Sequence, residues 1–366
     1  MRRITPLILG GGPAGSAAAI TLARGGAKPL ILERARTGGD AICGGFVSWR
    51  TLASLDRLGL DESTLRGHRI NQVRLFAGSR RATAPLPHRA IGISRKRLDS
   101  LLLDKAQGEG AAVERGVTVR DIGHDGMIRL SDEGQIDAES VFLATGKHNV
   151  RGITRERPQA GEDQTLGLRV MLSPHPALTA LIGSAIELHM FDGGYCGILL
   201  NENGDANLCL AMRKSRLTQA SGQPQALLAQ LGCENPAFGE RLAFMGAGQA
   251  IDAIAAVPYG WRTHDTRPGL FRLGDQAAVI PSLAGEGNGI ALASGMMAGS
   301  AWLAGGAAAA LPYQQGFAKR TRRPVRLASW LWHRGETPIT ARLALHVVRA
   351  FPAAAGMLAE LTRIRD

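Results

Sequence analysis

Residues 7–34 contain the pattern that most constrains the fold of this chain: an apolar run, a glycine cluster, an alanine-rich stretch and a second apolar run. The run Leu7–Leu9 predicts a buried parallel strand, and Gly10, Gly12 and Gly15 follow it in G-x-G-x-x-G spacing. In this spacing the first glycine makes a tight turn, the second admits a pyrophosphate to backbone N–H groups, and the third lets the helix pack on the strand. The pattern predicts a βαβ unit that binds a dinucleotide at a helix N-terminus.

An acidic residue closes the second strand of this unit. Residues 29–32 are apolar, and Glu33 follows them, 18 positions after Gly15. A carboxylate at this strand end can accept both hydroxyls of an adenosine ribose. A glycine-rich turn in an ordinary α/β protein would explain the glycines but not the strand, helix, second strand and acid in this order.

Composition narrows the class of protein. The 366 residues are 45% hydrophobic, and they contain no apolar run of transmembrane length. The N-terminus enters the first strand directly, so we expect no signal peptide. A cytoplasmic location is therefore expected. The four cysteines are not closely paired, so no metal and no disulfide framework is expected. The net charge of +12 favours anionic partners, but aromatic residues make up only 5% and no nucleic-acid motif is present. We therefore expect no nucleic-acid partner.

Three further segments have the small-residue composition of loops that approach a planar or anionic ligand. They are residues 37–48, 140–146 and 268–290. In the last of them a strand precedes Asp275, a second glycine cluster follows, and a small-residue helix at 291–304 begins behind it. This order repeats the strand, loop and helix N-terminus of the opening unit. A helix N-cap is the alternative role for Asp275.

The middle of the chain predicts a separate sheet. Strands are expected at 170–172, 186–191, 194–200 and 206–212, and helices at 49–60, 97–110, 224–231 and 339–350. The pair Asn203-Gly204 predicts a hairpin. A strand is expected at 70–76, followed by a turn at Pro85 and Pro87. A β-meander is expected from residues 113–119, 127–130 and 136. A crossover out of the nucleotide-binding domain is expected at 151–165. An antiparallel sheet of this kind can form the wall of a substrate pocket.

Together these motifs resemble those of FAD-dependent oxidoreductases of the glutathione-reductase-like superfamily, and more narrowly its branch of geranylgeranyl reductases and aromatic hydroxylases (group A flavoprotein monooxygenases). The segments that carry the resemblance are Gly10–Gly15 with Glu33, Cys43–Gly45, Ser94–Asp99, Ala144–Gly146, and Gly274-Asp275 with Gly285–Gly289. The resemblance implies an α/β fold with a Rossmann-like FAD-binding domain interleaved with an antiparallel β-sheet substrate domain. The implied domains are 1–48, 91–150 and 268–310 for FAD, 49–90 and 151–267 for substrate, and 311–366 as a C-terminal helical region.

The resemblance also implies roles for single residues. The first glycine motif would hold the FAD pyrophosphate, Glu33 the adenosine ribose, and the helix after the second glycine cluster the pyrimidine edge of the flavin. Arg95 aligns with an arginine that reaches the FAD, and Asp275 would bind the ribityl chain or pyrophosphate. The implied cofactor-binding set is Gly10, Gly12, Pro13, Ala14, Gly15, Glu33, Arg34, Gly44, Gly45, Arg95, Thr145, Gly146, Gly274, Asp275, Pro281, Gly285, Gly287, Asn288, Gly289 and Ile290.

Cys43, His148 and Tyr195 are the candidate catalytic residues. Cys43 resembles a residue of the loop beside the flavin in the reductases, and a small buried cysteine without chemistry is the alternative. His148 can serve as an acid or base, although most single histidines are exposed or structural. The substrate site is expected between the flavin and the sheet of residues 186–212. Its expected lining is Cys43, Phe46, His189, Tyr195 and Tyr259.

Departures from the family patterns bear on the reaction. Hydroxylases of this branch usually carry Asp-Gly where this chain has Thr145-Gly146, and the halogenase stretch Trp-x-Trp-x-Ile-Pro is absent. Only Tyr195 remains of the Tyr-x-Trp-x-Phe-Pro stretch of many reductases. We expect hydride transfer that reduces or dehydrogenates a hydrophobic isoprenoid-, quinone- or polyketide-like molecule. The alternative is NAD(P)H- and oxygen-dependent hydroxylation of a phenolic or polyketide-like substrate. With no second dinucleotide motif, NADPH or NADH would dock transiently as the electron donor.

The C-terminal tail differs in character from the rest. Five basic residues between 319 and 326 precede Trp330 and Trp332. A helical cap with a solvated basic face is one explanation, and a peripheral contact with the inner face of a membrane is the other. The second explanation would suit a membrane-associated electron carrier or a maturation factor for another protein. The oligomeric state is not predicted.

Overall fold

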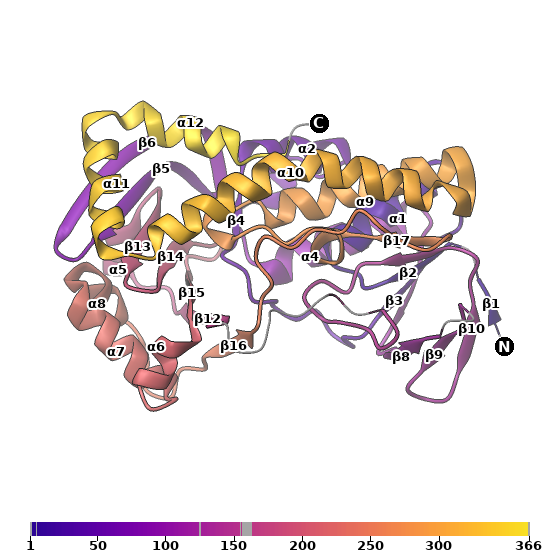
Figure 1. Ribbon diagram of the computed structural model, residues 1–366, viewed down its shortest axis with the longest axis horizontal. Helices are drawn as coiled ribbons and strands as arrows, with labels where there is room; N and C mark the ends of the chain where they lie inside the picture. Colours follow the sequence, from indigo (N-terminus) through magenta and orange to yellow (C-terminus); the bar gives the residue numbers. More distant parts are fainter. Residues whose placement is uncertain (1, 5, 124–125, 154, 156–162, 365–366) are drawn as a thin grey trace.

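The computed structural model describes residues 2–4, 6–123, 126–153, 155 and 163–364 (Figure 1). Within these residues the strands form a five-stranded sheet, an eight-stranded sheet and a four-stranded sheet. The five-stranded sheet has the order β17-β11-β2-β3-β7, and the eight-stranded sheet has the order β16-β12-β15-β14-β13-β5-β6-β4. The predicted α/β fold, with segments of the two larger units alternating along the chain, is confirmed.

All neighbouring strands of the five-stranded sheet are parallel. The inner strands β2 and β11 are short and apolar because both faces are covered, whereas the edge strand β7 is partly exposed. Leu7 and Leu9 of β2 face the four-stranded sheet, whereas Ile8 packs under the helices. The strands are β2 (Leu7–Leu9), β3 (Leu30–Glu33), β7 (Ala112–Arg115), β11 (Val141–Leu143) and β17 (Leu270–Arg272). The covering helices are α1 (Pro13–Arg24), α4 (Arg95–Gly108) and α9 (Gly287–Gly305).

The segment expected as one strand at 113–119 is divided in the structure. Its first part, β7, extends the parallel sheet beside β3, and β8 (Val119–Ile122) begins the meander with β9 (Ile128–Leu130) and β10 (Gln135–Asp137). Gly116, at φ +77°, makes the break between the two parts. The short β1 (Arg2–Arg3) adds to β10 in parallel. The predicted meander is therefore present, but it begins later than expected.

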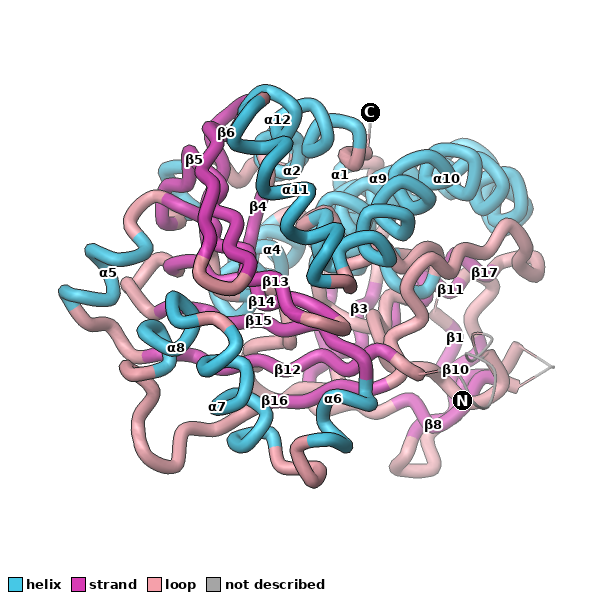
Figure 2. Tube along the Cα trace, turned by 60° about the vertical axis from the view of Figure 1, so that its left-hand side comes forward, coloured by secondary structure: helices cyan, strands magenta, loops and turns pink. Residues whose placement is uncertain are grey.

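The eight-stranded sheet lies beside the helices α5 (Pro176–Ile182), α6 (Lys214–Gln219), α7 (Pro224–Glu234) and α8 (Pro236–Leu242) (Figure 2). Its β13–β5 pair is parallel and its other pairs are antiparallel, so the prediction of a purely antiparallel sheet was wrong at that one pair. The predicted hairpin joins β14 and β15, with Gly204 at φ +82° in the turn. The strands are β4 (Phe46–Val47), β5 (His68–Ala77), β6 (Arg80–Gly92), β12 (Thr165–Leu172), β13 (Ala185–Phe191), β14 (Gly194–Leu200), β15 (Ala206–Arg213) and β16 (Asp252–Ala255).

The expected turn at Pro85 and Pro87 was wrong. The chain reverses at Gly78, which has φ +58°, and β6 continues through both prolines. Proline lacks a backbone N–H and is therefore tolerated on the unpaired side of an edge strand. The neighbouring β4 pairs only with Gly92 and Ile91, so it does not reach the prolines.

Helices cover both units. The outer face of the eight-stranded sheet packs under α5, α6, α7 and α8. We expected α2 (Trp49–Arg57) and α3 (Glu62–Leu65) in the substrate domain. Leu55 and Leu65 instead join the same apolar core as Ile8 of β2 and the helices that cover the five-stranded sheet. The chain ends in α10 (Ala310–Gly335), α11 (Pro338–Ala350) and α12 (Pro352–Leu361), which lie along the upper edge in Figure 1.

The contact between α1 and α9 is close enough to require glycine. A Cβ on Gly295 would lie 2.3 Å from the carbonyl oxygen of Ala14 and 2.8 Å from the backbone nitrogen of Ala18. A Cβ on Gly299 would lie 2.9 Å from the Cβ of Thr21. These distances are too short for any side chain, so the two glycines allow α9 to pack this closely on α1.

This contact gives a matched pair of substitutions. We expect Gly295→Ala to destabilise the fold by about 1–3 kcal/mol, because backbone atoms of α1 must move to admit one methyl group. Gly316→Ala, inside α10 where a Cβ would meet nothing within 4 Å, should be neutral or stabilising by up to about 1 kcal/mol. Urea unfolding of both variants measures the difference. Equal midpoints for the two variants would contradict the packing argument.

Candidate active site

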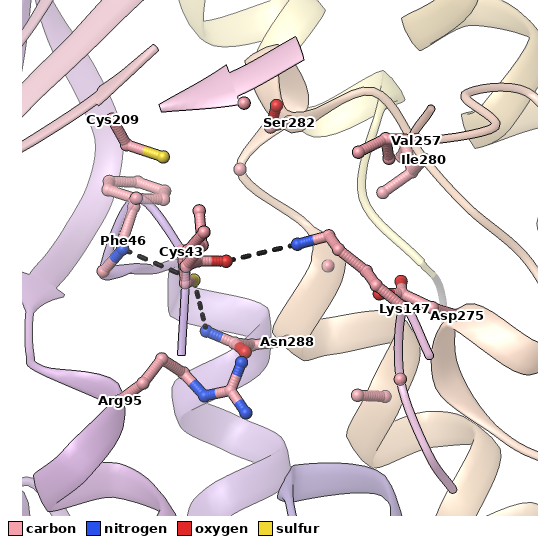
Figure 3. Close-up of a pocket in the computed structure, with 18 of the residues that line it drawn as sticks. Cys43, Phe46, Arg95, Lys147, Cys209, Val257, Asp275, Ile280, Ser282 and Asn288 are labelled. Atoms are coloured by element: carbon pink, nitrogen blue, oxygen red, sulfur yellow. Dashed lines mark hydrogen bonds between the residues drawn. The ribbon is translucent and has the colours of Figure 1, made fainter. Parts of the chain in front are cut away.

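A cavity lies between the five-stranded and the eight-stranded sheets, and Figure 3 shows some of the residues that line it. It encloses about 1390 Å³ of empty space, part of which is open to solvent. Its nucleotide side is made by Gly12–Ala14, Gly146, Gly274-Asp275 and Gly285 with Asn288. Its opposite side is made by residues of β13, β14 and β15. The cavity therefore joins the two motif regions that the sequence separates by more than half of its length.

The first glycine motif leaves no room for side chains at the end of β2. A Cβ on Gly15 would lie 2.0 Å from the carbonyl oxygen of Gly10, and one on Gly10 would lie 2.5 Å from that of Ala144. Gly10 has φ +104°, which other residues rarely adopt. Helix α1 begins after Gly12 without a side-chain cap, so its first N–H groups stay free for an anion. This geometry fits a dinucleotide pyrophosphate.

Glu33 stands where the sequence places it. Its Oε2 accepts a hydrogen bond from the N–H of Gly11 at 2.7 Å, and its Oε1 accepts one from the N–H of Ala35 at 2.8 Å. These two bonds fix the carboxylate beside the glycine turn, at the position from which it can hold a ribose. The predicted role of Glu33 is consistent with this placement.

The structure does not place His148, the predicted catalytic acid or base, at the cavity. The residue is exposed, it does not line the cavity, and its Nε2 lies 3.3 Å from Nη2 of Arg34, next to Glu33 at the ribose end. Partial burial and the neighbouring cations of Arg34, Arg155 and Lys147 lower the pKa of His148. Thr145 Oγ1 donates to the carbonyl of His148 at 2.7 Å. Thr145 and Pro281 do not line the cavity either.

A second helix N-terminus faces the same cavity. Helix α9 begins after Glu286 without a side-chain cap, and a Cβ on Gly287 or on Gly44 would meet nothing within 4 Å. Asn288 Nδ2 lies 4.0 Å from Cys43 Sγ, which also accepts the N–H of Gly45 at 3.5 Å (Figure 3). Two uncapped helix ends and glycine-lined open space fit a cofactor with an anionic pyrophosphate and a planar ring that gains negative charge on reduction.

Arg95 supplies a fixed positive charge beside the first motif. Its Nε and Nη2 each donate to a different carboxylate oxygen of Asp99 at 2.8 Å. Burial alone would lower the pKa of Arg95, but Asp99 outweighs it and the pKa is raised. A Cβ on Gly12 would lie 3.5 Å from Nη2 of Arg95, so the guanidinium borders the place of the pyrophosphate. This position agrees with the role that the family resemblance implies.

The alternation of side chains along β14 determines which of its residues face the cavity. Tyr195, Gly197 and Leu199 of β14 point into the cavity, whereas Cys196 and Ile198 pack under the outer helices. The remaining wall is largely apolar and includes Ile186, Leu188, Ile254 and Val257.

His189 was wrongly predicted to line this wall. It follows Leu188 by one position and therefore lies on the other face of β13, fully buried. There its Nε2 lies 3.2 Å from Oε2 of Glu187, and its ring stacks on Phe76 at 4.4 Å. Burial lowers the pKa of His189, so the imidazole belongs to the packing of the sheet.

Two tyrosines form the polar part of the substrate wall. Tyr195 and Tyr259 both line the cavity, and the Tyr259 hydroxyl is hydrogen-bonded to Oγ of the exposed Ser282. Trp332 packs edge-on against both rings, at 5.8 Å and 5.6 Å between centroids. Burial raises the pKa of both tyrosines, and it raises that of the nearby Cys209 thiol to about 12. All three groups therefore keep their protons at neutral pH.

Two site features escaped the sequence analysis. Lys147 lines the cavity and donates through Nζ to the carbonyl of Ile42 at 3.2 Å, which links the strand end of β11 to the Cys43 loop. Its position directly after Gly146 was the available signal. The other feature is Arg363, which ties the C-terminal segment to Glu286 inside the second glycine cluster. No local pattern connects residues so far apart in the sequence.

The Glu286–Arg363 pair is buried and multiply bonded. Arg363 Nη1 donates to Glu286 Oε2 at 2.8 Å and to the carbonyl of Ala284 at 2.6 Å, and Ser48 Oγ donates to the same carboxylate at 3.2 Å. The guanidinium lies over the rings of Trp49 and Phe46, at 5.1 Å and 5.6 Å. The pair therefore holds the glycine cluster, which borders the cavity, against α2 and the end of α12.

Comparisons with known proteins agree with this geometry. Residues 3–149 match the family described as FAD binding domain. The menaquinone reductase of Mycolicibacterium smegmatis is 26% identical over 328 residues, which cover 83% of this chain and 77% of the relative. A chloroplastic geranylgeranyl diphosphate reductase of Oryza sativa is 34% identical over 124 residues, 32% of this chain and 26% of that protein.

Among solved structures, Pseudomonas aeruginosa PqsL in complex with 2-aminobenzoylacetate superimposes with a TM-score of 0.75 at 16% identity. The alignment covers 94% of this chain and all of that one. At this identity the likeness establishes the fold. It confirms the arrangement of the parallel sheet, the larger sheet and the C-terminal helices.

The buried pair gives a pH-dependent prediction. Arg363→Met leaves the Glu286 carboxylate buried without a cation, which should destabilise the fold by about 3–5 kcal/mol at neutral pH. Burial already raises the pKa of Glu286 and Arg363 opposes that rise, so the pKa should rise further in the variant. A raised folded-state pKa means that stability is lost as pH increases above the ordinary glutamate value of 4.5. We therefore expect the penalty to grow from pH 4.5 to pH 7.5 in urea unfolding.

The control is the double variant Glu286→Gln/Arg363→Met, which removes both charges. It should be more stable than Arg363→Met at neutral pH, with a penalty that changes little with pH. Because Glu286 lies inside the glycine cluster, Arg363→Met should also release FAD more readily, measured by the fluorescence of free flavin. A penalty for Arg363→Met that does not vary with pH would contradict the assignment.

Proposed function

We propose that this chain, an FAD-dependent oxidoreductase, transfers a hydride between its flavin and a double bond or ring of a hydrophobic isoprenoid-, quinone- or polyketide-like molecule. The observation that carries the proposal is the substrate wall, that is, the side of the cavity made by β13, β14 and β15 with Val257 and Tyr259. It is largely apolar, and burial raises the pKa of its titratable side chains, Tyr195, Tyr259 and Cys209, so that they stay protonated at neutral pH. The relatives named menaquinone reductase and geranylgeranyl diphosphate reductase support the same substrate class.

The cofactor would be held at both ends of the cavity. Once reduced by its donor, bound FAD would supply the electron pair of the reaction as a hydride. The N–H groups at the start of α1, with Arg95, would bind the pyrophosphate, and Glu33 would bind the ribose. The start of α9 would stabilise the negative charge that reduction brings to the ring. NADPH or NADH would dock transiently as the donor, and a cytoplasmic location is part of the proposal for that reason.

Reduction of a double bond also needs a proton at the second carbon. The Tyr259 hydroxyl is placed for this role because it lines the cavity and is hydrogen-bonded to Ser282, which is exposed to solvent. A proton given by Tyr259 Oη can be replaced through Ser282 Oγ. Dehydrogenation would run the same route in reverse. Trp332, packed behind both tyrosine rings, excludes water from that side.

Oxygen-dependent hydroxylation is the second candidate. The observation that favours it is the fold likeness to PqsL, which is described as a probable FAD-dependent monooxygenase. Hydroxylation of a phenol is assisted by a base that removes the phenolic proton. Among the described residues that line the cavity, Asp275 is the only carboxylate and no histidine is present. Asp275 lies on the nucleotide side, away from the substrate wall. This distribution favours hydride transfer.

An anaerobic reaction distinguishes the two candidates. The bound flavin is reduced photochemically under nitrogen and mixed with a menaquinone that carries a short isoprenoid tail. Hydride transfer predicts that the visible flavin band returns without oxygen and that the product gains two hydrogen atoms. A band that returns only with oxygen, with a product heavier by one oxygen atom, would establish the hydroxylase. An absence of any flavin band after incubation with FAD would overturn both.

The proton route gives a variant test. Tyr259→Phe should slow product formation by about 100-fold, the usual contribution of a general acid, with the bound flavin spectrum unchanged. Tyr313→Phe is the matched control, because Tyr313 is buried and its hydroxyl donates to the carbonyl of Arg272 at 2.9 Å, outside the cavity. Single-turnover rates measure both. Equal rates for Tyr259→Phe and wild type would remove Tyr259 from the mechanism.

A further inference from the structure

We propose that α10, α11 and α12 form a docking surface for an anionic lipid bilayer. The surface has two parts. The apolar part consists of the exposed side chains Ile339, Leu343, Val347, Phe351, Met357 and Leu361. The basic part is a stripe of exposed side chains on α10: Lys319, Arg322, Arg323, Arg326 and Arg334. Figures 1 and 2 show the three helices together along the upper edge of the molecule.

Helix α11 is apolar on two opposite sides. Ala341 and Leu345 are buried and pack inward. Ile339, Leu343 and Val347 repeat at a spacing of four and form an outer row, with exposed fractions of 79%, 62% and 41%. Packing within the chain explains the inner row only. The outer row needs a partner that takes apolar side chains.

Helix α12 continues the apolar part. It contains no buried residue, and Met357 and Leu361 are 66% and 51% exposed. Phe351, at the bend of 113° between α11 and α12, is 68% exposed. The one charged side chain of α12, Glu360, is bound by Arg50 at 3.0 Å. The two helices therefore expose several large apolar side chains at adjoining positions, which is typical of an interaction site.

The charge around this apolar part is positive. Residues 310–361 contain eight lysines and arginines but only two acidic residues, Glu336 and Glu360. Both acids are in ion pairs with arginines from other segments, Arg213 and Arg50. Trp330 is 55% exposed within the basic stripe, with the guanidinium of Arg334 5.8 Å from its ring centroid. Exposed arginines with an interfacial tryptophan beside apolar side chains suit anionic headgroups above acyl chains.

The geometry favours docking on a bilayer surface over insertion as a membrane-spanning helix and over contact with a second copy of the chain. At about 1.5 Å per residue the 13 residues of α11 extend about 20 Å, too short to cross a hydrocarbon core of about 30 Å, so the helix would lie in the interface. The apolar stretch within α9 and α10 is long enough to span, but α9 packs against α1 as a core helix. A second copy docked face to face on the same surface would bring two basic stripes together, and like charges oppose that contact.

The docking surface is fixed and lies close to the cavity. The Glu286–Arg363 pair holds the end of α12, and Arg50 holds Glu360, so the apolar face cannot fold inward freely. Leu345 of α11 belongs to the same apolar cluster as Tyr195, Tyr259 and Leu283, which line the cavity. One helix therefore separates the bilayer from the substrate wall. Delivery of a bilayer-dissolved substrate rests on the proposed function, whereas docking itself rests on the exposed faces.

The test is sedimentation of the full FAD-loaded chain with vesicles of phosphatidylcholine, alone or with phosphatidylglycerol. We expect strong binding to the anionic vesicles, weakened by high salt. Leu343→Glu/Met357→Glu should reduce that binding at least tenfold, because it places charge in the apolar part. Arg322→Glu/Arg326→Glu should remove the preference for phosphatidylglycerol. Leu311→Glu, an exposed leucine near the start of α10, is the matched control and should bind like wild type.

Flavin content and melting temperature show that each variant is folded. Equal sedimentation of wild type and Leu343→Glu/Met357→Glu, or no sedimentation of wild type, would overturn the proposal. If wild type self-associates in light scattering but does not bind vesicles, and Leu343→Glu/Met357→Glu does not self-associate, the surface would belong to a second copy instead. Turnover of a water-soluble short-tailed quinone separates the two proposals. Vesicle binding by wild type without turnover would contradict the proposed hydride transfer and leave the docking proposal intact. Turnover without vesicle binding would contradict the docking proposal and leave the proposed hydride transfer intact.

Discussion

The structure depends on the close approach of α1 to the carboxyl end of β2. An anionic pyrophosphate is best held here by backbone N–H groups, and these can reach it only if no Cβ stands between helix and strand. Two glycines meet this requirement. A Cβ on Gly15 would collide with the carbonyl oxygen of Gly10, and a Cβ on Gly10 would collide with that of Ala144. The same closeness makes α1 an alanine-rich helix that packs on a second small-residue helix, α9. The cavity, with its two free helix ends, follows from this packing.

Much of the fold could be predicted because its signals are local. The short apolar strands, the glycine turns and the Asn203-Gly204 hairpin each depend on neighbouring residues. The pairing of β5 with β13, the course of β6 through Pro85 and Pro87, and the place of α2 depend on contacts between distant segments. Backbone propensity does not encode such contacts, and for this reason the sequence did not reveal them.

The candidate site divides in the same way. The glycine motifs, Glu33, Arg95 and Tyr195 stand in short segments with distinctive chemistry, and the structure gathers them around one cavity or at its ribose end. The error at His189 was avoidable, since it alternates with the cavity-lining Leu188 along β13. The Glu286–Arg363 pair was not foreseeable, because only the folded C-terminal helices bring the arginine to the glycine cluster.

The interleaving of the two units constrains how the molecule acquires its structure. The inner side of α1, with Ala14, Ala17 and Ala18, is covered by a helix that begins at Gly287. The βαβ unit is synthesised before α9, and its apolar side therefore stays open to water until some 260 further residues have been made. Such late closure raises contact order, slows folding and prolongs the exposure of surface that can aggregate. The nucleotide-binding unit is therefore not a module that can mature ahead of the rest of the chain.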